Sequence, residues 1–325
     1  MKALSRIWLA MAAVLAFAVP GSAMSQGYPN RPIKLIGADS PGGAPDPLAR
    51  LAALAIGDAL GQPVVVENRP GAAGLPGAES VAKSPPDGYT LLVITSAVYA
   101  ILPNLRRDLP FDVTKDFAAV TRLATASNVL VVNNDLPAAN VAELVRYAKS
   151  KPGALNYASA GIGTPGHLAG EMLNLLAGIQ VAHIPYKGAA PALLDVIAGN
   201  AQYIFTSPLA AGAHMNAGRV RAIATTGTER NPSLPNLPMV ADSVPGYEIT
   251  QSWGVAVPAG TPPDIVKRLN EAFVKAMASQ DVKEKVLKTG AVPAGDSPAA
   301  FEAFMAAERA RMGDVIKRSG IVLKD

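Results

Sequence analysis

Two glycine-rich turns in this chain have the composition of an anion-binding site. The first covers residues 40–46 and the second residues 159–165. Each turn follows an apolar run typical of a strand and precedes a run typical of a helix. The start of a helix leaves backbone N–H groups without partners and carries about half a positive charge, and glycine lets the backbone approach a ligand closely. The pattern predicts a cleft that binds a carboxylate from both sides.

The second turn also matches the G-x-G-x-x-G pattern of dinucleotide-binding proteins at residues 161–166. That pattern requires an acidic residue about 20 positions later to bind the ribose hydroxyls. Residues 183–190 contain no acid, and Lys187 lies among them. Pro165 also has no N–H at the helix start, where the pattern needs donors. We therefore favour an anion-binding turn over a dinucleotide site, and a purely structural turn stays an alternative.

A third junction of the same kind follows at residues 185–191. Its backbone N–H groups and the hydroxyl of Tyr186 could serve a ligand, but a core-edge tyrosine with a satisfied hydroxyl is an equal alternative. Arg50, Arg69 and Lys187 are the candidate side-chain partners for a carboxylate. Structural ion pairs explain Arg50 and Arg69 equally well, so we do not predict a salt bridge to the ligand.

The sequence offers no convincing catalytic or metal-binding machinery. His167 and Glu171 share a helix face, but a metal site needs a third ligand and the chain has only three histidines and no cysteine. No nucleophile elbow is present, and the partial matches to penicillin-binding motifs at residues 80–83 and 288–290 lack their third element. We expect a protein that is not an enzyme and that binds no cofactor or metal.

The first 25 residues have the pattern of a secretory signal peptide. Lys2 and Arg6 precede an apolar stretch at residues 7–19, and small residues follow at 20–25. The stretch is short for a membrane span, so an uncleaved anchor is the weaker alternative. Without these residues the chain has 27 basic and 25 acidic residues and no run of five like charges, which argues against a nucleic-acid partner. We expect a periplasmic monomer.

Short strand-like runs alternate with helical runs, which favours an α/β fold built from parallel βαβ units. The predicted strands are residues 33–36, 64–67, 90–95, 129–132, 155–158, 181–185, 203–206 and 220–225. The predicted helices are residues 47–60, 75–82, 141–149, 165–177, 191–198, 262–278, 281–288 and 298–319. Asp46 and Thr164, each followed by proline, are predicted N-caps.

Two segments have the character of strands that cross between lobes, residues 117–132 and residues 246–258. The predicted domains are a first lobe of residues 26–126 plus 247–325 and a second lobe of residues 127–246. We expect each lobe to contain a mainly parallel sheet flanked by helices, with the two crossing strands as a hinge. Ligands of such open sheets bind beyond the carboxyl ends of the strands, where the glycine turns lie.

Many motifs occur in an order that resembles one protein family. They are YPNRPI at 28–33, PGG at 41–43, VENRPG at 66–71, PDGYTL at 86–91, YAS at 157–159, PYKG at 185–188, WG at 253–254 and PAGTP at 258–262. The chain resembles the extracytoplasmic solute-binding receptors of tripartite tricarboxylate transporters, the Bug or TctC family. The resemblance covers nearly the whole chain after the leader.

The resemblance implies a type II periplasmic-binding (Venus flytrap) fold that closes on a small carboxylate through backbone amides and bridging waters. It also implies delivery of the ligand to a membrane permease. A sensor that presents its closed state to a sensor kinase is the alternative, and a periplasmic hydrolase is a weaker one. The predicted ligand-binding residues are Asp39, Ser40, Pro41, Gly42, Gly43, Asp46, Ser96, Ser159, Ala160, Gly161, Gly163, Thr164, His167, Tyr186, Lys187, Gly188 and Thr206.

Two of these residues depart from the family pattern. Family members usually carry an acid near Thr206, and a ligand ammonium often needs such a partner, so the departure argues against amino-acid recognition. Asp39 replaces a residue that is usually apolar or aromatic. A carboxylate there would repel a polyanion such as citrate and could instead accept a hydrogen bond from a hydroxyl or attract a cationic group. The sequence alone does not name the ligand.

Overall fold

The computed structural model describes residues 27–38 and 45–319. Residues 1–30 and 31–325 form separate units, and the fold described below is that of the second unit. The predicted signal peptide lies outside the described residues, and so do Asp39, Ser40, Pro41, Gly42 and Gly43 of the first glycine turn. No helix within the described ranges is long and apolar enough to cross a membrane.

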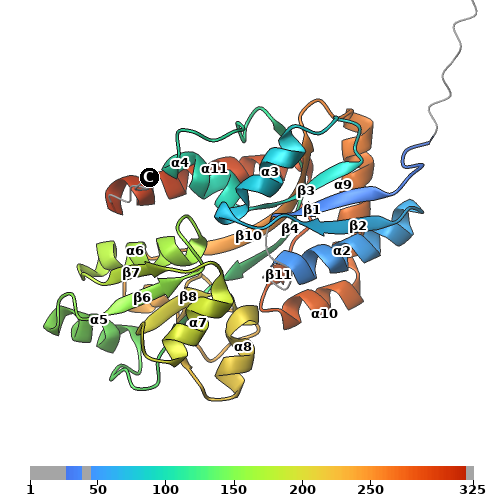
Figure 1. The fold of residues 1–325 in the computed structure, drawn as a ribbon. Coiled ribbons are helices and arrows are strands. Elements are labelled where there is room, and N and C mark those ends of the chain that lie inside the picture. Colours follow the sequence, from blue (N-terminus) through green and yellow to red (C-terminus); the bar gives the residue numbers. More distant parts are fainter. Residues whose placement is uncertain (1–26, 39–44, 320–325) are drawn as a thin grey trace, which may run out of the picture. The chain divides into compact units, whose positions relative to one another are not determined.

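The first sheet contains six strands in the order β11-β4-β10-β3-β1-β2 (Figure 1). Strand β1 pairs in parallel with β2 and β3, whereas β10 runs antiparallel to both β3 and β4. The strands are β1 (Ile33–Gly37), β2 (Val64–Asn68), β3 (Thr90–Thr95), β4 (Phe117–Ser127), β10 (Thr250–Pro258) and β11 (Val292–Pro293).

The second sheet contains five strands in the order β7-β6-β8-β5-β9. Strand β6 pairs in parallel with β7 and β8, and β5 runs antiparallel to β8 and β9. The strands are β5 (Val129–Val132), β6 (Asn156–Ser159), β7 (Ala182–Pro185), β8 (Tyr203–Thr206) and β9 (Arg221–Thr225).

The prediction of mainly parallel sheets was wrong in detail, because both sheets are mixed. Parallel pairs arise where a helix connects two strands, as between β1 and β2 or between β6 and β7. Strand β4 instead leads directly through Asn128 into β5, and β10 returns to the first sheet late in the chain. These strands lie antiparallel to their neighbours. The α/β class with two sheets is confirmed.

Helices cover both faces of the first sheet (Figure 1). On one face α2 (Pro45–Leu60), α9 (Pro263–Ala278) and α10 (Gln280–Lys288) pack together. On the other face lie α3 (Leu75–Ala82), the π-helix η2 (Ala97–Ile101), α4 (Leu102–Leu105) and α11 (Pro298–Ser319). Alternate residues of β3 serve this second layer, since Leu92 and Ile94 pack in one cluster with Val81 and Phe301.

The second sheet is also covered on both faces. Its helices are α5 (Val141–Ser150), α6 (Pro165–Ala177), α7 (Ala189–Ile197) and α8 (Pro208–Asn216). Successive side chains of β5 point to opposite faces of the sheet. Leu130 packs in the cluster that contains Leu168 of α6. Val131 packs in another cluster with Leu193 of α7.

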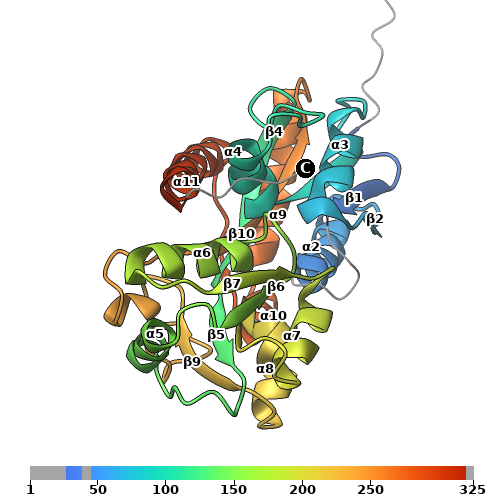
Figure 2. The same cartoon turned by 60° about the vertical axis from the view of Figure 1, so that its left-hand side comes forward.

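One apolar cluster continues from the first sheet to the second. It contains Met312 of α11 and Leu173 of α6, and Figure 2 shows α11 passing beside α6. The buried hydroxyl of Tyr247 adds a hydrogen bond of 2.8 Å to the carbonyl oxygen of Ala169 in α6. The two sheets are therefore joined by packing as well as by the crossing strands.

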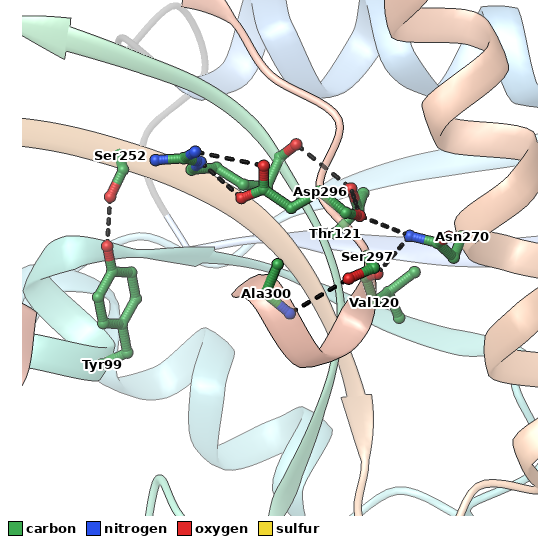
Figure 3. A network of polar contacts seen from close by, with 9 residues as sticks. Tyr99, Val120, Thr121, Ser252, Asn270, Asp296, Ser297 and Ala300 are labelled. Carbon is green, nitrogen blue, oxygen red and sulfur yellow. Dashed lines mark hydrogen bonds and ion pairs between the residues drawn. The ribbon is translucent and has the colours of Figure 1, made fainter. Parts of the chain in front are cut away.

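A polar network holds the crossing strand β4 to the helices behind it (Figure 3). The carboxylate of Asp296 pairs with Arg122 at 2.8 Å, and the backbone carbonyl of Asp296 accepts a bond of 2.7 Å from the Asn270 amide. Asn270 also donates to the carbonyl of Val120 at 2.8 Å. Tyr99 shares a buried hydrogen bond with Ser252 of β10. These bonds fix the central strands of the first sheet.

Most predicted elements are present with bounds shifted by two residues or fewer. Helix α2 begins at Pro45, so Asp46 lies in the first helical turn and is not the N-cap that we predicted. Four elements were not predicted from the sequence: η2, α4, α8 and β11. A signal for α8 was available, because Ser207 followed by Pro208 is the same N-cap and proline pattern as Thr164 followed by Pro165.

Candidate functional site

A cavity of about 1140 Å³ is bordered by residues of both sheets. The first sheet and its connections contribute Ala38, Pro45, Gly74, Ser96 and Trp253 among others. The second contributes Gly161, Thr164, Gly188, Phe205 and Thr206 among others. Ala38 and Pro45, the described residues that come before and after positions 39–44, both border this cavity.

Four helices begin at the cavity. Its wall contains Pro45 at the start of α2, Pro165 at the start of α6, Ala189 at the start of α7 and Ser207, the N-cap of α8. Each helix start carries a partial positive charge and unpaired N–H groups. Four such ends around one space make a strongly favourable environment for an anion.

The charged side chains of the wall also favour an anion. Lys187 borders the cavity, and none of the described lining residues is Asp or Glu. Asp46 lies just inside α2 but forms an ion pair with Arg50 at 3.1 Å and accepts a hydrogen bond from Asn68 at 2.9 Å. Its charge is therefore compensated, and the described wall repels no anion.

The second glycine turn uses several of its own N–H groups internally. The hydroxyl of Thr164 caps the N–H of His167 at 3.4 Å, as the sequence predicted. The N–H of Gly161 donates to Ser159 Oγ at 3.1 Å, and that of Gly163 donates to His167 Nδ1 at 3.3 Å. Within the described residues, the N–H groups of Ala160, Ile162 and Gly166 have no such partner. These three are the donors open to a ligand.

Two glycines allow α6 to lie close against the sheet. A Cβ at Gly166 would lie 2.4 Å from the carbonyl oxygen of Phe205. A Cβ at Gly170 would lie 2.1 Å from the ring of Tyr157. Any side chain at these positions would push the helix outward. The position of the α6 N-terminus at the cavity therefore depends on both glycines.

Two stacked histidines lie behind the second turn. The rings of His167 and His183 are 4.2 Å apart, and His183 Nε2 shares a hydrogen bond of 2.7 Å with Ser159 Oγ. Burial lowers the pKa of His167 to about 4 and that of His183 to about 3, with His167 as a smaller second cause for His183. Both rings are therefore neutral at neutral pH and act as supports for the turn.

The described residues contain no group of three or more His, Asp or Glu side chains that could hold a metal ion. Glu171, the partner of His167 in the metal alternative, instead accepts a hydrogen bond of 2.6 Å from the hydroxyl of Tyr157. The alternative reading of His167 as a structural residue fits this arrangement.

The predicted site residues fall into two groups. Those that border the cavity are Ser96, Ala160, Gly161, Thr164, Tyr186, Lys187, Gly188 and Thr206. Those outside its described wall are Asp46, Ser159, Gly163 and His167. A Cβ at Gly163 would lie 3.5 Å from Leu102 of the first lobe, so this residue lies at a contact between the lobes. Binding of a ligand by any of these residues stays a prediction.

The hydroxyl of Tyr186 is already satisfied. It donates to the carboxylate of Asp195, and burial together with that carboxylate raises the pKa of Tyr186 to about 12. Its ring borders the cavity. Tyr186 is therefore a core-edge tyrosine with a satisfied hydroxyl, and it also contributes to the cavity wall.

Several lining residues were not predicted. Residues 70–74 border the cavity, and Ala72 and Ala73 adopt left-handed φ angles of 43° and 56°. Such strain in residues with a Cβ is typical of functional sites. Asn128 and Gln251 also border the cavity, from the crossing strands. The glycines around residue 72 were an available signal, whereas no local pattern marks the two amides.

Comparison with known proteins identifies the family. Residues 48–321 match the family model of the tripartite tricarboxylate transporter family receptor, TctC. The chain belongs to this family. It is 35% identical to protein BugT of Bordetella pertussis over 299 residues, which cover 91% of this chain and 92% of that protein. The predicted family is thus confirmed.

Two solved structures of the same fold carry small carboxylates in their names. R. palustris Rpa4515 with adipate aligns with a TM-score of 0.87 at 35% identity and covers 91% of this chain and 99% of that one. MatC (Rpa3494) from Rhodopseudomonas palustris with bound malate aligns with a TM-score of 0.81 at 29% identity, covering 89% and 100%. TctC proteins are solute-binding receptors and not enzymes. This chain is therefore a solute-binding receptor.

Proposed function

We propose that the protein is a periplasmic receptor that captures a small organic acid in the cavity between its lobes and delivers it to a tripartite tricarboxylate-type membrane permease. The observation that carries this proposal is the convergence of four helix N-termini on one cavity whose described wall has no acidic side chain. A carboxylate is the ligand that such a site stabilises best. The carboxylates named with Rpa4515 and MatC support the same class.

The main-chain donors of this proposal are the N–H groups of Ala160, Ile162 and Gly166, with further donors from the turn at Lys187 and Gly188. The proposal keeps Asp39, Ser40, Pro41, Gly42 and Gly43 as ligand-binding residues on the evidence of the sequence alone. The lobes are residues 26–126 plus 247–325 and residues 127–246, with the strand crossings as the hinge. A ligand that contacts both lobes favours the closed form, which the permease then recognises.

The first experiment measures binding without turnover. A thermal-shift screen over monocarboxylates, dicarboxylates, tricarboxylates and amino acids should raise the melting temperature with some of the acids. Nuclear magnetic resonance of the released ligand should show it chemically unchanged. If no carboxylate raises the melting temperature, the proposed ligand class is wrong.

A substitution that stabilises the fold but repels the ligand gives a sharper test. Ala190 is the second residue of α7 and borders the cavity. In Ala190→Asp the carboxylate should stabilise the helix by about 0.3–1 kcal/mol, while its charge repels a bound carboxylate. We expect a melting temperature equal to or above that of the wild type and an affinity at least ten-fold lower by calorimetry.

The matched control is Ala142→Asp. Ala142 is the second residue of α5 in the same lobe and does not border the cavity. This variant should gain similar stability and keep wild-type affinity. Equal affinities in the two variants would contradict binding at the helix ends around the cavity.

A further inference from the structure

The buried side-chain NH₂ group of a residue that borders the cavity has no hydrogen-bond partner among the described residues. Asn128 lies between β4 and β5, is fully buried and borders the cavity. Its Oδ1 accepts a hydrogen bond from Gln251 Nε2. Its Nδ2 is buried and has no partner among the described residues. A buried donor without a partner costs about 1–3 kcal/mol, so an acceptor that bonds to it would remove this cost.

Two hydrogen bonds to Thr226 hold the backbone of Asn128 in place. Its N–H donates to Thr226 Oγ1 at 2.8 Å, and its carbonyl accepts from the N–H of Thr226 at 2.9 Å. The side chain is held on its other side by Gln251. Asn128, which borders the cavity, is therefore held in place on both sides.

The position of Asn128 relative to the second glycine turn follows from strand order. Strand β8 lies between β6 and β5, and its Thr206 pairs with Val129, the residue after Asn128. The turn that follows β6 is thus two strand spacings away, about 10 Å. The cavity extends between these two places, since both border it.

The surroundings of Asn128 in the cavity wall are polar but uncharged. They are Gln251 of β10, Thr206 at the end of β8, and Ser207, the N-cap of α8. None of these offers a counter-charge for an ammonium group. A neutral donor in such a place suits an oxygen acceptor.

We propose that Asn128 Nδ2 forms a second polar subsite that binds an oxygen acceptor at the far end of the ligand. The proposal rests on the proposed function, in which the first carboxylate lies at the helix N-termini. The ligand is then a short-chain acid with a second oxygen group at its other end, either a second carboxylate or a neutral carbonyl. Gln251 is a positioning residue, because it orients the Asn128 amide.

The test compares acids that differ only at the far end. The wild type is titrated with succinate, glutarate and adipate and with the monocarboxylates of equal chain length, butanoate, pentanoate and hexanoate. The best diacid should bind at least ten-fold more tightly than its matching monoacid. In Asn128→Ala the diacid should lose ten- to hundred-fold in affinity while the monoacid is unchanged, as expected for a hydrogen bond to a charged group.

Asn128→Asp is a second variant of the same shape. It keeps an oxygen toward Gln251 and replaces the donor by a negative charge, so it should weaken the diacid more than Asn128→Ala does. The half-amide of the best diacid identifies the acceptor. Binding equal to the diacid assigns a neutral carbonyl, and weaker binding assigns a carboxylate. Either result requires the loss in Asn128→Ala.

Asn133 provides the control for replacing a buried asparagine. Its Nδ2 donates to the carbonyl of Val196 at 2.8 Å and its Oδ1 accepts from the N–H of Asp135 at 2.8 Å. Asn133→Ala should lower the melting temperature and leave the diacid-to-monoacid ratio unchanged. An unchanged ratio in folded Asn128→Ala and Asn128→Asp would overturn the subsite. Absence of any acid binding by the wild type would instead overturn the proposed function.

Discussion

At the residue scale, buried side chains behind the second glycine turn determine its shape. His167 accepts from the N–H of Gly163, His183 bonds with Ser159, and the two rings stack. None of these groups borders the described cavity, yet they determine which N–H groups remain for a ligand. The turn therefore depends on neutral imidazoles in a buried position.

This arrangement predicts a loss of stability in mild acid. The pKa of His167 is about 4 and that of His183 about 3 in the folded chain, against an ordinary value near 6.5. As pH falls from 6.5 to 4, the unfolded chain takes up protons that the folded chain cannot, so stability falls throughout that range. Well above pH 6.5, where both states of the chain hold these two rings neutral, His167 and His183 contribute no pH dependence. We expect a loss on the order of 2 kcal/mol between pH 7 and pH 5, measured by urea unfolding.

His183→Gln should flatten this pH dependence, because one of the two depressed groups is gone. A profile that is equally steep in His183→Gln would show that other groups cause the acid sensitivity.

At the scale of elements, the site is a meeting of helix starts. Helices α6, α7 and α8 each follow a strand of the second sheet and begin at the cavity, and α2 begins there from the first. The closeness of α6 to the sheet depends on Gly166 and Gly170. The packing of α6 against the sheet therefore determines where the N–H donors at the start of this helix lie.

Gly170→Ala tests whether close packing of α6 outweighs the gain in helix propensity that a Gly→Ala change usually brings. The new methyl would collide with the ring of Tyr157 and cost about 1–3 kcal/mol. Displacement of the α6 N-terminus should also weaken carboxylate binding. The measurements are the free energy of unfolding and calorimetric affinity.

The control is Gly212→Ala in α8, where an added Cβ would meet nothing within 4 Å. There the substitution should stabilise the helix by roughly 0.5–1 kcal/mol. If Gly170→Ala were also stabilising, the close packing of α6 against Tyr157 would not constrain the helix.

At the scale of the whole molecule, one apolar cluster extends through both sheets, with α11 packed against α6. Two strand crossings and this shared core make independent unfolding of either sheet costly. The cavity lies between the same two sheets. A ligand that contacts both sheets therefore adds to the packing that already joins them.

We predict a single unfolding transition in calorimetry, with the calorimetric enthalpy equal to the van't Hoff enthalpy. A bound carboxylate should move the whole transition upward. Replacement of Met312 by Ala in the shared cluster should lower the midpoint and keep one transition. Two separate transitions, with only one of them shifted by ligand, would contradict a shared core.

The sequence by itself determined the elements and the polarity of the site. Strand runs, the Thr164-Pro165 helix start and the order of the family motifs are local patterns, and local patterns follow from backbone preference and period. They identified the family, most strands and helices and the second glycine turn as a wall of the cavity.

Only the tertiary structure decided which groups face the cavity. Asn128 and Gln251 are 123 residues apart and meet because two crossing strands lie side by side. The direction of β5 against β8 and the role of His183 as a support likewise depend on long-range packing. Local sequence patterns cannot predict such contacts, because the residues that form them are distant from each other in the chain.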